Sequence, residues 1–224
     1  MTAIPTPLNM DRSERVVIRP EDQDWLPSPN PKVLRKPLER ERAESGETTS
    51  IVRYLPNSVF SPHSHPLGEE IYVLDGEFAD EKGRYPAGTY IRNPPGSRHT
   101  PYSEIGCTLF VKLNQFDPDD TQQLTLLPEA RSWQAGHGRL RVQPLHSHGT
   151  TSTAVVQWPV GARFQPHTHF GGEEIFVLSG TFEDEFGAYP KWTWLRNPHR
   201  SSHDPFSTEG SDILVRVGHL SGVS

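Results

Sequence analysis

The sequence is poor in cysteine and in long apolar segments, and each shortage excludes a class of protein. Cys107 is the single cysteine among 224 residues, so an intramolecular disulfide, a Cys-x-x-Cys redox pair and a thiolate zinc finger are excluded. No run of 18 apolar residues occurs, and the first ten residues lack a charged segment followed by an apolar one. We therefore expect a cytoplasmic protein with no membrane partner.

Basic clusters and helix signals are also scarce. Lys and Arg number 22 against 28 Asp and Glu, for a formal net charge of −6. Nucleic acid is not an expected partner, because a phosphate backbone is bound by clustered Lys and Arg. Proline (22 residues) and glycine (18 residues) are scattered between β-branched and aromatic segments. This composition is typical of short strands joined by tight turns.

One stretch of the sequence is present twice. Residues Phe60–Ser103 and Phe164–Ser207 align without a gap at an offset of 104, and 25 of these 44 positions are identical. A repeat of this length indicates duplicated domains rather than a solenoid. We expect a first domain at 1–125, which includes an N-terminal arm, and a second domain at 126–224. The many short strands predict an all-β fold of sandwiches or barrels.

The arm and the turns carry local predictions. Residues 1–46 are polar and rich in proline, with an edge strand at Val16–Ile18, and we expect Trp25, Val33 and Leu34 to pack on the outside of the first barrel. Asp75-Gly76 and Lys82-Gly83 are turn dipeptides between apolar runs, so they predict hairpin turns. The same turns are predicted in the second repeat, at Ser179-Gly180 and Phe186-Gly187.

Four residues of metal-binding type recur in register in the two repeats. Alternation along a strand places His63 and His65 on one face. Glu69 shares an apolar face with Ile71, and a carboxylate there needs a partner or a cation. His99 returns from a later strand. We predict two divalent-metal sites, one formed by His63, His65, Glu69 and His99, the other by His167, His169, Glu173 and His203.

Other polar residues are expected to be structural. Glu70 and Glu174 fall on the opposite face of their strands, where we expect solvent. The acidic pairs at 80–81 and 184–185 are expected to be solvated turn residues. Arg92 and Arg196, which also repeat, are expected to form structural ion pairs, and Cys107 to be a small buried residue. Four further histidines are expected at ordinary surface or core positions, namely His137, His146, His148 and His219.

The repeated motif resembles the two-part signature of the cupin superfamily, His-x-His-x3-Glu-x6-Gly followed by Gly-x5-Pro-x-Gly-x2-His. The residues that match it are His63, His65, Glu69, Gly76, Gly88, Pro94, Gly96 and His99. The longer runs Glu-Glu-Ile-Tyr-Val-Leu and Arg-Asn-Pro-Pro-Gly-Ser resemble the cupin of ChrR-type anti-ECF-sigma factors. The resemblance implies two jelly-roll barrels, a bicupin, with metal on the predicted ligands. Zinc is the metal that it implies.

The sequence departs from this pattern in two places. ChrR-type anti-sigma factors carry a helical zinc domain with a His-x3-Cys-x2-Cys element, and residues 1–46 contain neither His nor Cys. This absence argues against a sigma factor as partner. In the second repeat, Trp192 replaces Gly88 and Arg200 replaces Gly96. These replacements predict a changed turn before His203, with Arg200 either a surface residue or a cation beside the metal.

Two functions remain open from the sequence. The first is a sensor or regulatory module that binds a small anionic or enolisable molecule, with zinc completed as a tetrahedron by four protein ligands. The alternative is a dioxygenase acting on a diketone or hydroxylated aryl ketone, with iron, manganese or nickel retaining open coordination positions. A seed-storage-like role is not favoured, because such proteins usually lose these ligands. Exposed strand edges would suit a homodimer.

Overall fold

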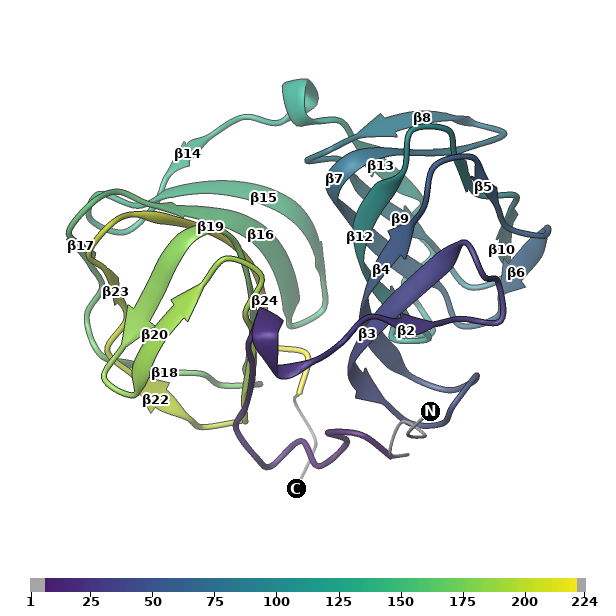
Figure 1. Cartoon of the computed structure of the whole chain (residues 1–224). Helices are drawn as coiled ribbons and strands as arrows, with labels where there is room; N and C mark the ends of the chain where they lie inside the picture. Colours follow the sequence, from purple (N-terminus) through teal and green to yellow (C-terminus); the bar gives the residue numbers. More distant parts are fainter. Residues whose placement is uncertain (1–6, 221–224) are drawn as a thin grey trace. The chain divides into compact units, whose positions relative to one another are not determined.

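The computed structural model describes residues 7–220, and the chain divides into two compact units (Figure 1). The first unit comprises Met1–Met10 and Asp24–Arg131, and the second comprises Asp11–Gln23 and Ser132–Ser224. Residues 11–23 thus belong to the second unit, whereas the sequence analysis grouped the whole arm with the first. The reason is strand pairing, because Val16–Ile18 is the edge strand of the second sheet.

The first unit is built from antiparallel strands. Its larger sheet has the order β13-β9-β7-β12-β4-β3-β2, β6 and β10 form a separate pair, and the short strands β5, β8 and β11 complete the barrel. The elements are β2 (Leu26–Pro27), β3 (Val33–Arg40), β4 (Thr48–Tyr54), β5 (Ser58–Val59), β6 (His63–His65), β7 (Glu69–Asp80), β8 (Gly83–Pro86), β9 (Tyr90–Asn93), β10 (Ser97–His99), β11 (Tyr102–Ser103), β12 (Cys107–Leu113), β13 (Leu124–Leu126) and the 3-10 turn η2 (Pro128–Ala130).

The second unit repeats this architecture. Its larger sheet has the order β1-β21-β19-β24-β16-β15-β14, and β18 pairs with β22. The elements are β1 (Val16–Ile18), η1 (Pro20–Asp22), β14 (Gln134–Ala135), β15 (Arg141–His148), β16 (Thr151–Trp158), β17 (Ala162–Arg163), β18 (His167–Thr168), β19 (Glu173–Asp184), β20 (Gly187–Pro190), β21 (Trp194–Asn197), β22 (Ser202–His203), β23 (Phe206–Ser207) and β24 (Ser211–Val217). The predicted all-β fold of two tandem jelly-roll barrels is confirmed.

Two of the predicted hairpin turns are instead bulges inside long strands. Gly76 lies within β7 and Gly180 within β19, each beside a register shift against the neighbouring strand. Both have positive φ, and a Cβ on Gly76 would lie 2.1 Å from the carbonyl oxygen of Gly106. Glycine is therefore required by a close approach of backbone and not by a chain reversal. Lys82-Gly83 does close the β7–β8 hairpin as predicted.

Each barrel encloses its own apolar core. Ile71 and Val73, on one face of β7, are almost completely buried, as the alternation predicted. Val33 lies in the same core cluster, so its predicted outer position is wrong: β3 pairs with β4 and turns Val33 inward. Trp25 does lie outside, with the guanidinium of Arg53 4.0 Å from its ring.

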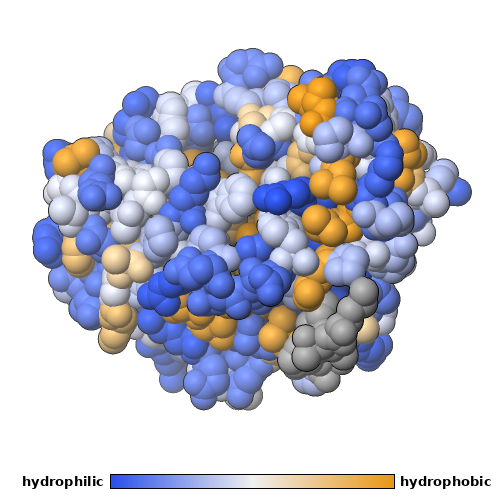
Figure 2. All heavy atoms as spheres, in the orientation of Figure 1, coloured by the Kyte–Doolittle hydropathy of each residue, from blue (hydrophilic) through white to orange (hydrophobic). Residues whose placement is uncertain are grey.

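The face shown in Figure 2 is mainly hydrophilic, with hydrophobic residues in small groups. Among residues 7–220, no helix is long and apolar enough to cross a membrane.

Candidate metal sites

The first predicted ligand set is assembled by two paired strands and the start of a third. β10 pairs with β6 so that His99 lies directly opposite His63, while His65 lies two residues along on the same face. The ring centroids of these three histidines are 4.8–5.0 Å apart. Glu69 follows at the first residue of β7. The pairing of β6 with β10 therefore brings together His65 and His99, which are 34 positions apart in the sequence.

The side-chain atoms of this set converge on one point. The Nε2 atoms of His65 and His99 are 3.0 Å apart. The Oε2 atom of Glu69 lies 3.4 Å from the first and 3.5 Å from the second. The candidate ligand atoms of His63, His65 and His99 all lie within 4.8 Å of one another. The structure thus places Glu69 beside His65 and His99, while in this site only the three histidines form a group whose ligand atoms are all within that distance of one another.

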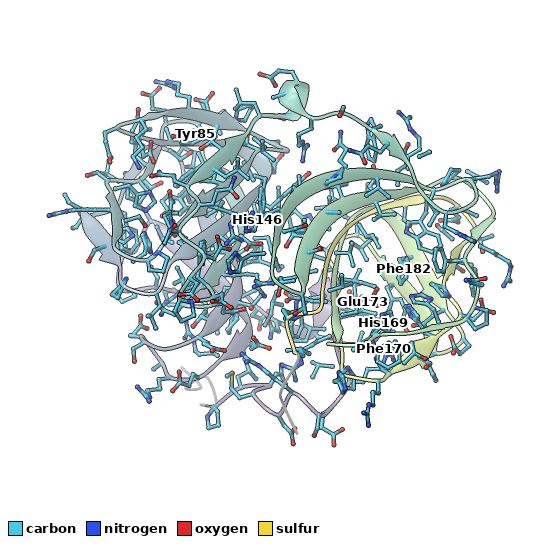
Figure 3. All side chains as sticks on the ribbon, turned by 180° about the vertical axis from the view of Figure 1, so that it is seen from behind. Tyr85, His146, His169, Phe170, Glu173 and Phe182 are labelled. Carbon is cyan, nitrogen blue, oxygen red and sulfur yellow. The ribbon has the colours of Figure 1, made fainter. Side chains whose placement is uncertain are left out.

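The second set has the same arrangement. β18 and β22 place His167 opposite His203, and Glu173 opens β19. The Oε2 atom of Glu173 lies 3.4 Å from Nε2 of His169 and 3.6 Å from Nε2 of His203. One ligand atom from each of the four residues lies within 4.8 Å of all the others. Figure 3 shows His169 and Glu173 close together, near Phe182, in the second barrel.

The second set fits a divalent cation on its own chemistry. The Nε2 atoms of His169 and His203 are buried and make no hydrogen bond. Burial lowers the pKa of His169 to about 3, so its imidazole is neutral near pH 7. Burial also raises the pKa of Glu173, which shows that this carboxylate is costly to ionise where it stands. Two unshared imidazole lone pairs beside a buried carboxylate are the donors that a metal ion satisfies.

The first set is comparable but differs in its charges. Burial lowers the pKa of His65. Burial also acts to lower the pKa of His99, but its hydrogen bond with Asp80 and the charge of Glu69 outweigh that effect, so the pKa of His99 is raised. His65 is thus neutral near pH 7, and its Nε2 atom lies 3.0 Å from that of His99, where the two rings share a proton or face a cation. The set therefore also fits a divalent metal.

A second carboxylate supports one histidine of each site. The Nδ1 atom of His99 lies 3.5 Å from Asp80, and that of His203 lies 3.4 Å from Asp184. Both aspartates are buried and accept a hydrogen bond from a tyrosine hydroxyl, Tyr85 or Tyr189. The prediction of solvated turn residues is wrong for both. Burial opposes their ionisation, but hydrogen bonds, that of the histidine first, lower the pKa of each.

An amide likewise fixes each ligand carboxylate. Asn93 donates from Nδ2 to Oε2 of Glu69 at 3.0 Å, and Asn197 donates to Oε2 of Glu173 at 2.9 Å. Residues that hydrogen-bond to metal ligands in this way hold those ligands in the orientation needed to bind the metal. Sequence reasoning missed these asparagines and the aspartates behind His99 and His203. Their signal was available, since all four recur at the offset of 104.

The residue that hydrogen-bonds to the asparagine behind each ligand set is charged in the second site and neutral in the first. Arg15, just before β1, donates from Nε to Asn197 at 3.0 Å and from Nη2 to Asp184 at 3.0 Å. In the first unit β13 pairs with β9 as β1 pairs with β21, which puts Gln123 in the equivalent place. Gln123 donates to Asn93 at 3.4 Å. A cation thus stands behind the second site where a neutral amide stands behind the first.

The turn before His203 keeps its shape in spite of the replacements. Arg200 has φ +65° and Trp192 φ +71°, against +82° at Gly96 and +89° at Gly88. The amides of Gly96 and Arg200 donate to the carbonyls of His65 and His169 respectively, each at 2.9 Å. The predicted change of turn is therefore wrong, because the backbone holds a non-glycine residue in the left-handed region. Arg200 is exposed, in agreement with a surface arginine.

Several structural predictions can be judged from burial and pairing. Glu70 is buried and Arg92 donates to it at 2.8 Å, so its predicted exposure is wrong while the predicted ion pair of Arg92 is confirmed. Glu174 is also buried, and the indole of Trp194 donates to it at 2.8 Å. The second face of these strands is thus covered. Cys107 is buried as predicted, and burial raises the pKa of its thiol to about 12.

The four other histidines lie outside the two ligand clusters. The ring of His137 packs 4.7 Å from that of Phe164. His146 is buried in β15, with His148 at the end of the same strand. Nε2 of His219 is 3.6 Å from Glu174. These are the ordinary core and surface positions that the sequence predicted.

A cavity of about 810 Å³ reaches the first ligand set. His63, His65 and Glu69 are among its lining residues, and its wall is mainly apolar, formed by residues that include Val52, Ile71, Phe78, Leu109 and Val111. Its volume is in the range of about 300–1,000 Å³ that small-molecule pockets occupy. In the second barrel the larger Trp158 stands at the position of Tyr54, which lines the cavity in the first, and packs 5.3 Å from Phe182.

Comparison with known proteins places this architecture in a family. The profile of the ChrR Cupin-like domain matches residues 13–117 and again residues 121–221. The chain therefore belongs to the ChrR cupin-like family and carries two copies of its domain. No curated protein matches the sequence.

Solved structures show the same double-barrel fold. A "putative dioxygenase" from Nostoc punctiforme superposes with a TM-score of 0.78 at 15% identity, over 93% of this chain and 83% of that one. Ylba from E. coli gives a TM-score of 0.73 at 13% identity, over 93% of both chains. Oxalate decarboxylase OxdC from Bacillus subtilis gives 0.64 at 15% identity, over 90% and 76%. At these identities the likeness concerns the fold.

Proposed function

We propose that this protein is a divalent-metal-binding bicupin whose first barrel binds a small molecule at its metal. The observation that carries the proposal is the cavity, which opens directly on His63, His65 and Glu69 and is otherwise mainly apolar. A closed structural metal site would need no such space. An apolar chamber with a few convergent polar groups is the usual form of a ligand site.

The charge of the site defines the ligand. Three neutral imidazoles, one carboxylate and a divalent ion leave a formal charge of about +1, so an anionic or enolate oxygen donor is favoured. When bound, the metal supplies a Lewis-acid centre for that donor. His63, His65, Glu69 and His99 would hold it, while Asp80 and Asn93 keep His99 and Glu69 in orientation. Zinc follows the ChrR resemblance, and iron, manganese and nickel suit the same ligand types.

A sensor or regulatory role is the first reading of such binding. Membership of the ChrR cupin-like family supports it. In that role the ligand would change the stability or the interactions of the protein and would leave unaltered.

A metal-dependent dioxygenase acting on a diketone or hydroxylated aryl ketone is the second candidate. The cavity beside the ligand set favours it, because a co-substrate and an apolar aryl or alkyl body both need room at the metal.

The test begins with metal content, measured by elemental mass spectrometry on protein purified anaerobically without chelator. About two ions per chain are expected. Thermal shift with 1-phenyl-1,3-butanedione should then show metal-dependent stabilisation in the wild type and none in His99→Ala. Oxygen consumption with the same compound would establish the dioxygenase, and binding without consumption would establish the sensor. Absence of metal from the purified and from the metal-incubated protein would overturn the proposal.

A further inference from the structure

Arg35 brings a positive charge into the cavity of the first barrel. Along β3, Val33 and Arg35 are two residues apart and face the same way, and Val33 is a core residue. Arg35 pairs with Val52, and both line the cavity with the metal ligands. The side chain of Arg35 is only 18% exposed. A guanidinium in such a place is costly unless it is paired.

The guanidinium of Arg35 is only partly paired, and its partner is a carboxylate exposed to solvent. Nη1 and Nη2 of Arg35 donate to Glu44 at 3.2 Å and 2.9 Å, whereas Nε is buried and has no hydrogen-bond partner. The side chain of Glu44 is 57% exposed. A carboxylate that far in solvent holds its partner weakly. The Nε–H of Arg35 is therefore without a partner, and the bonds of Nη1 and Nη2 are made to a replaceable acceptor.

The loop that carries Glu44 is anchored on both sides of it. The amide of Glu41 donates to the carbonyl of Glu47 at 2.9 Å, and Asn114 donates to the carbonyl of Gly46 at 2.8 Å. Glu44 lies between these anchors and also lines the cavity. It can leave Arg35 by side-chain rotation while the loop stays in place.

The second barrel lacks this cation. Val142 pairs with Val156 in β15 and β16 as Arg35 pairs with Val52 in β3 and β4. Val52 and Val156 are equivalent positions of the repeat, so Val142 stands where Arg35 stands in the first barrel. The arginine at this position is thus particular to the first barrel.

We infer that the ligand of the first barrel carries a carboxylate, which binds Arg35 in place of Glu44 while another oxygen donor of the ligand lies at the metal. The inference rests on the proposed function of this barrel. A bidentate carboxylate satisfies a guanidinium better than any neutral group. The ligand class is therefore an apolar acid with an enolisable or chelating group at its opposite end.

A pair of probes tests this inference. Both are aryl β-diketones: 4-acetoacetylbenzoate, which has a carboxylate opposite the diketone, and its neutral methyl ester. Titration calorimetry on metal-loaded wild-type protein should give about tenfold tighter binding of the acid, the gain expected from one charge-assisted hydrogen bond. Arg35→Met should remove this preference and leave the affinity for the ester unchanged.

Two further variants separate recognition from folding. Glu44→Gln leaves the interior untouched and removes the competing carboxylate, so it should tighten binding of the acid alone. Arg42→Met is the matched control, because Arg42 also lines the cavity but is 69% exposed and paired with Glu41. It should leave the preference for the acid intact.

Equal binding of acid and ester by the wild type would overturn the inference, as would an equal loss of both in Arg35→Met. If 1-phenyl-1,3-butanedione binds in a metal-dependent way while the acid gains nothing, only the role of Arg35 fails. If none of the three compounds binds, the proposed function fails and this inference fails with it.

Discussion

Asp80 and Asp184 determine which ring nitrogen of His99 and His203 faces the other ligands. Each lies near the Nδ1 atom of its histidine and leaves Nε2 toward the other ligands. A carboxylate there holds the imidazole tautomer and raises its donor strength. Such residues change metal affinity without touching the metal.

Asp80→Asn is expected to lower the metal affinity of the first site by about 10–100-fold, because an amide cannot supply the negative charge at Nδ1 of His99. Competition titration with a chromophoric chelator measures the change. Asp75→Asn in the same strand is the matched control, since Asp75 is exposed, and it should bind metal as the wild type does. Equal affinities for both variants would contradict the positioning role.

His169 makes the stability of the metal-free protein depend on pH. Its pKa is lowered to about 3 in the folded state, while an unfolded histidine titrates near about 6.5. Between these values the unfolded chain binds a proton that the folded chain does not, so stability is full above pH 6.5 and falls as the pH falls, by at most about 1.4 kcal/mol per unit.

Urea unfolding of chelator-treated protein between pH 7.5 and pH 5 measures this slope. His169→Gln should flatten it, because glutamine takes up no proton. Acid lability that is the same in the variant and the wild type would show that other groups dominate.

At the scale of the secondary-structure elements, the turn before the last histidine of each site requires a residue with positive φ. The first barrel has glycine at this position and the second has arginine. Gly96 and Arg200 both adopt positive φ, and a Cβ on Gly96 would meet nothing within 4 Å. The cost at Arg200 is therefore conformational rather than steric contact with neighbours.

Arg200→Gly is expected to stabilise the protein by about 0.5–1 kcal/mol, and Gly96→Ala to destabilise it by about 1 kcal/mol. Chemical denaturation of the two metal-free variants measures both. Opposite signs are the signature of the backbone effect, and destabilisation by Arg200→Gly would mean that the arginine side chain makes a contribution of its own.

The strand β1 has an energetic role through Arg15. Arg15→Gln leaves Asp184 buried without its cation, so a loss of about 1–3 kcal/mol is expected. Arg19→Gln is the control: Arg19 lies over the same Tyr189 ring at 5.9 Å, an arrangement worth about 0.5–1 kcal/mol at an exposed site. Thermal unfolding compares the two, and equal losses would remove Arg15 from the support of the second site.

The elements also show what the sequence could predict. The repeat was the most useful signal, because a position kept in two copies has the same local surroundings in both. The His and Glu residues that it singled out do cluster in the structure, and their role as metal ligands stays a prediction. Gly76 was predicted in a hairpin turn but lies beside a bulge, because both structures need a residue with positive φ. Glu70 was misassigned because the alternation of a strand says which residues share a face, and not whether the other face is covered.

Arg15 and Arg35 could not have been found in the sequence. Neither belongs to the repeat. The segment of Arg15 acquires its role by pairing with the distant strand β21, whereas Arg35 lies on β3, which pairs with the next strand β4. Strand partners far apart in the sequence are fixed by tertiary packing, which no local pattern records.

At the scale of the whole molecule, the two sites should titrate as independent units. We expect two metal ions per wild-type chain, one in a His63→Ala/His65→Ala variant, one in a His167→Ala/His169→Ala variant, and none when all four are replaced. Elemental analysis after desalting measures the series, and circular dichroism checks that each variant is folded. One ion in the wild type would show that one barrel has kept the ligands without the function.

The assignment of residues 11–23 to the second unit has a consequence for how the protein is made. These residues are synthesised before both barrels, and their partner strand β21 follows almost 180 residues later. The first barrel can close while translation continues, because β13 follows the strands that it covers. The second unit is complete only when β21 has been made, and a gene fragment starting at Ser132 would yield a barrel without β1 and without Arg15.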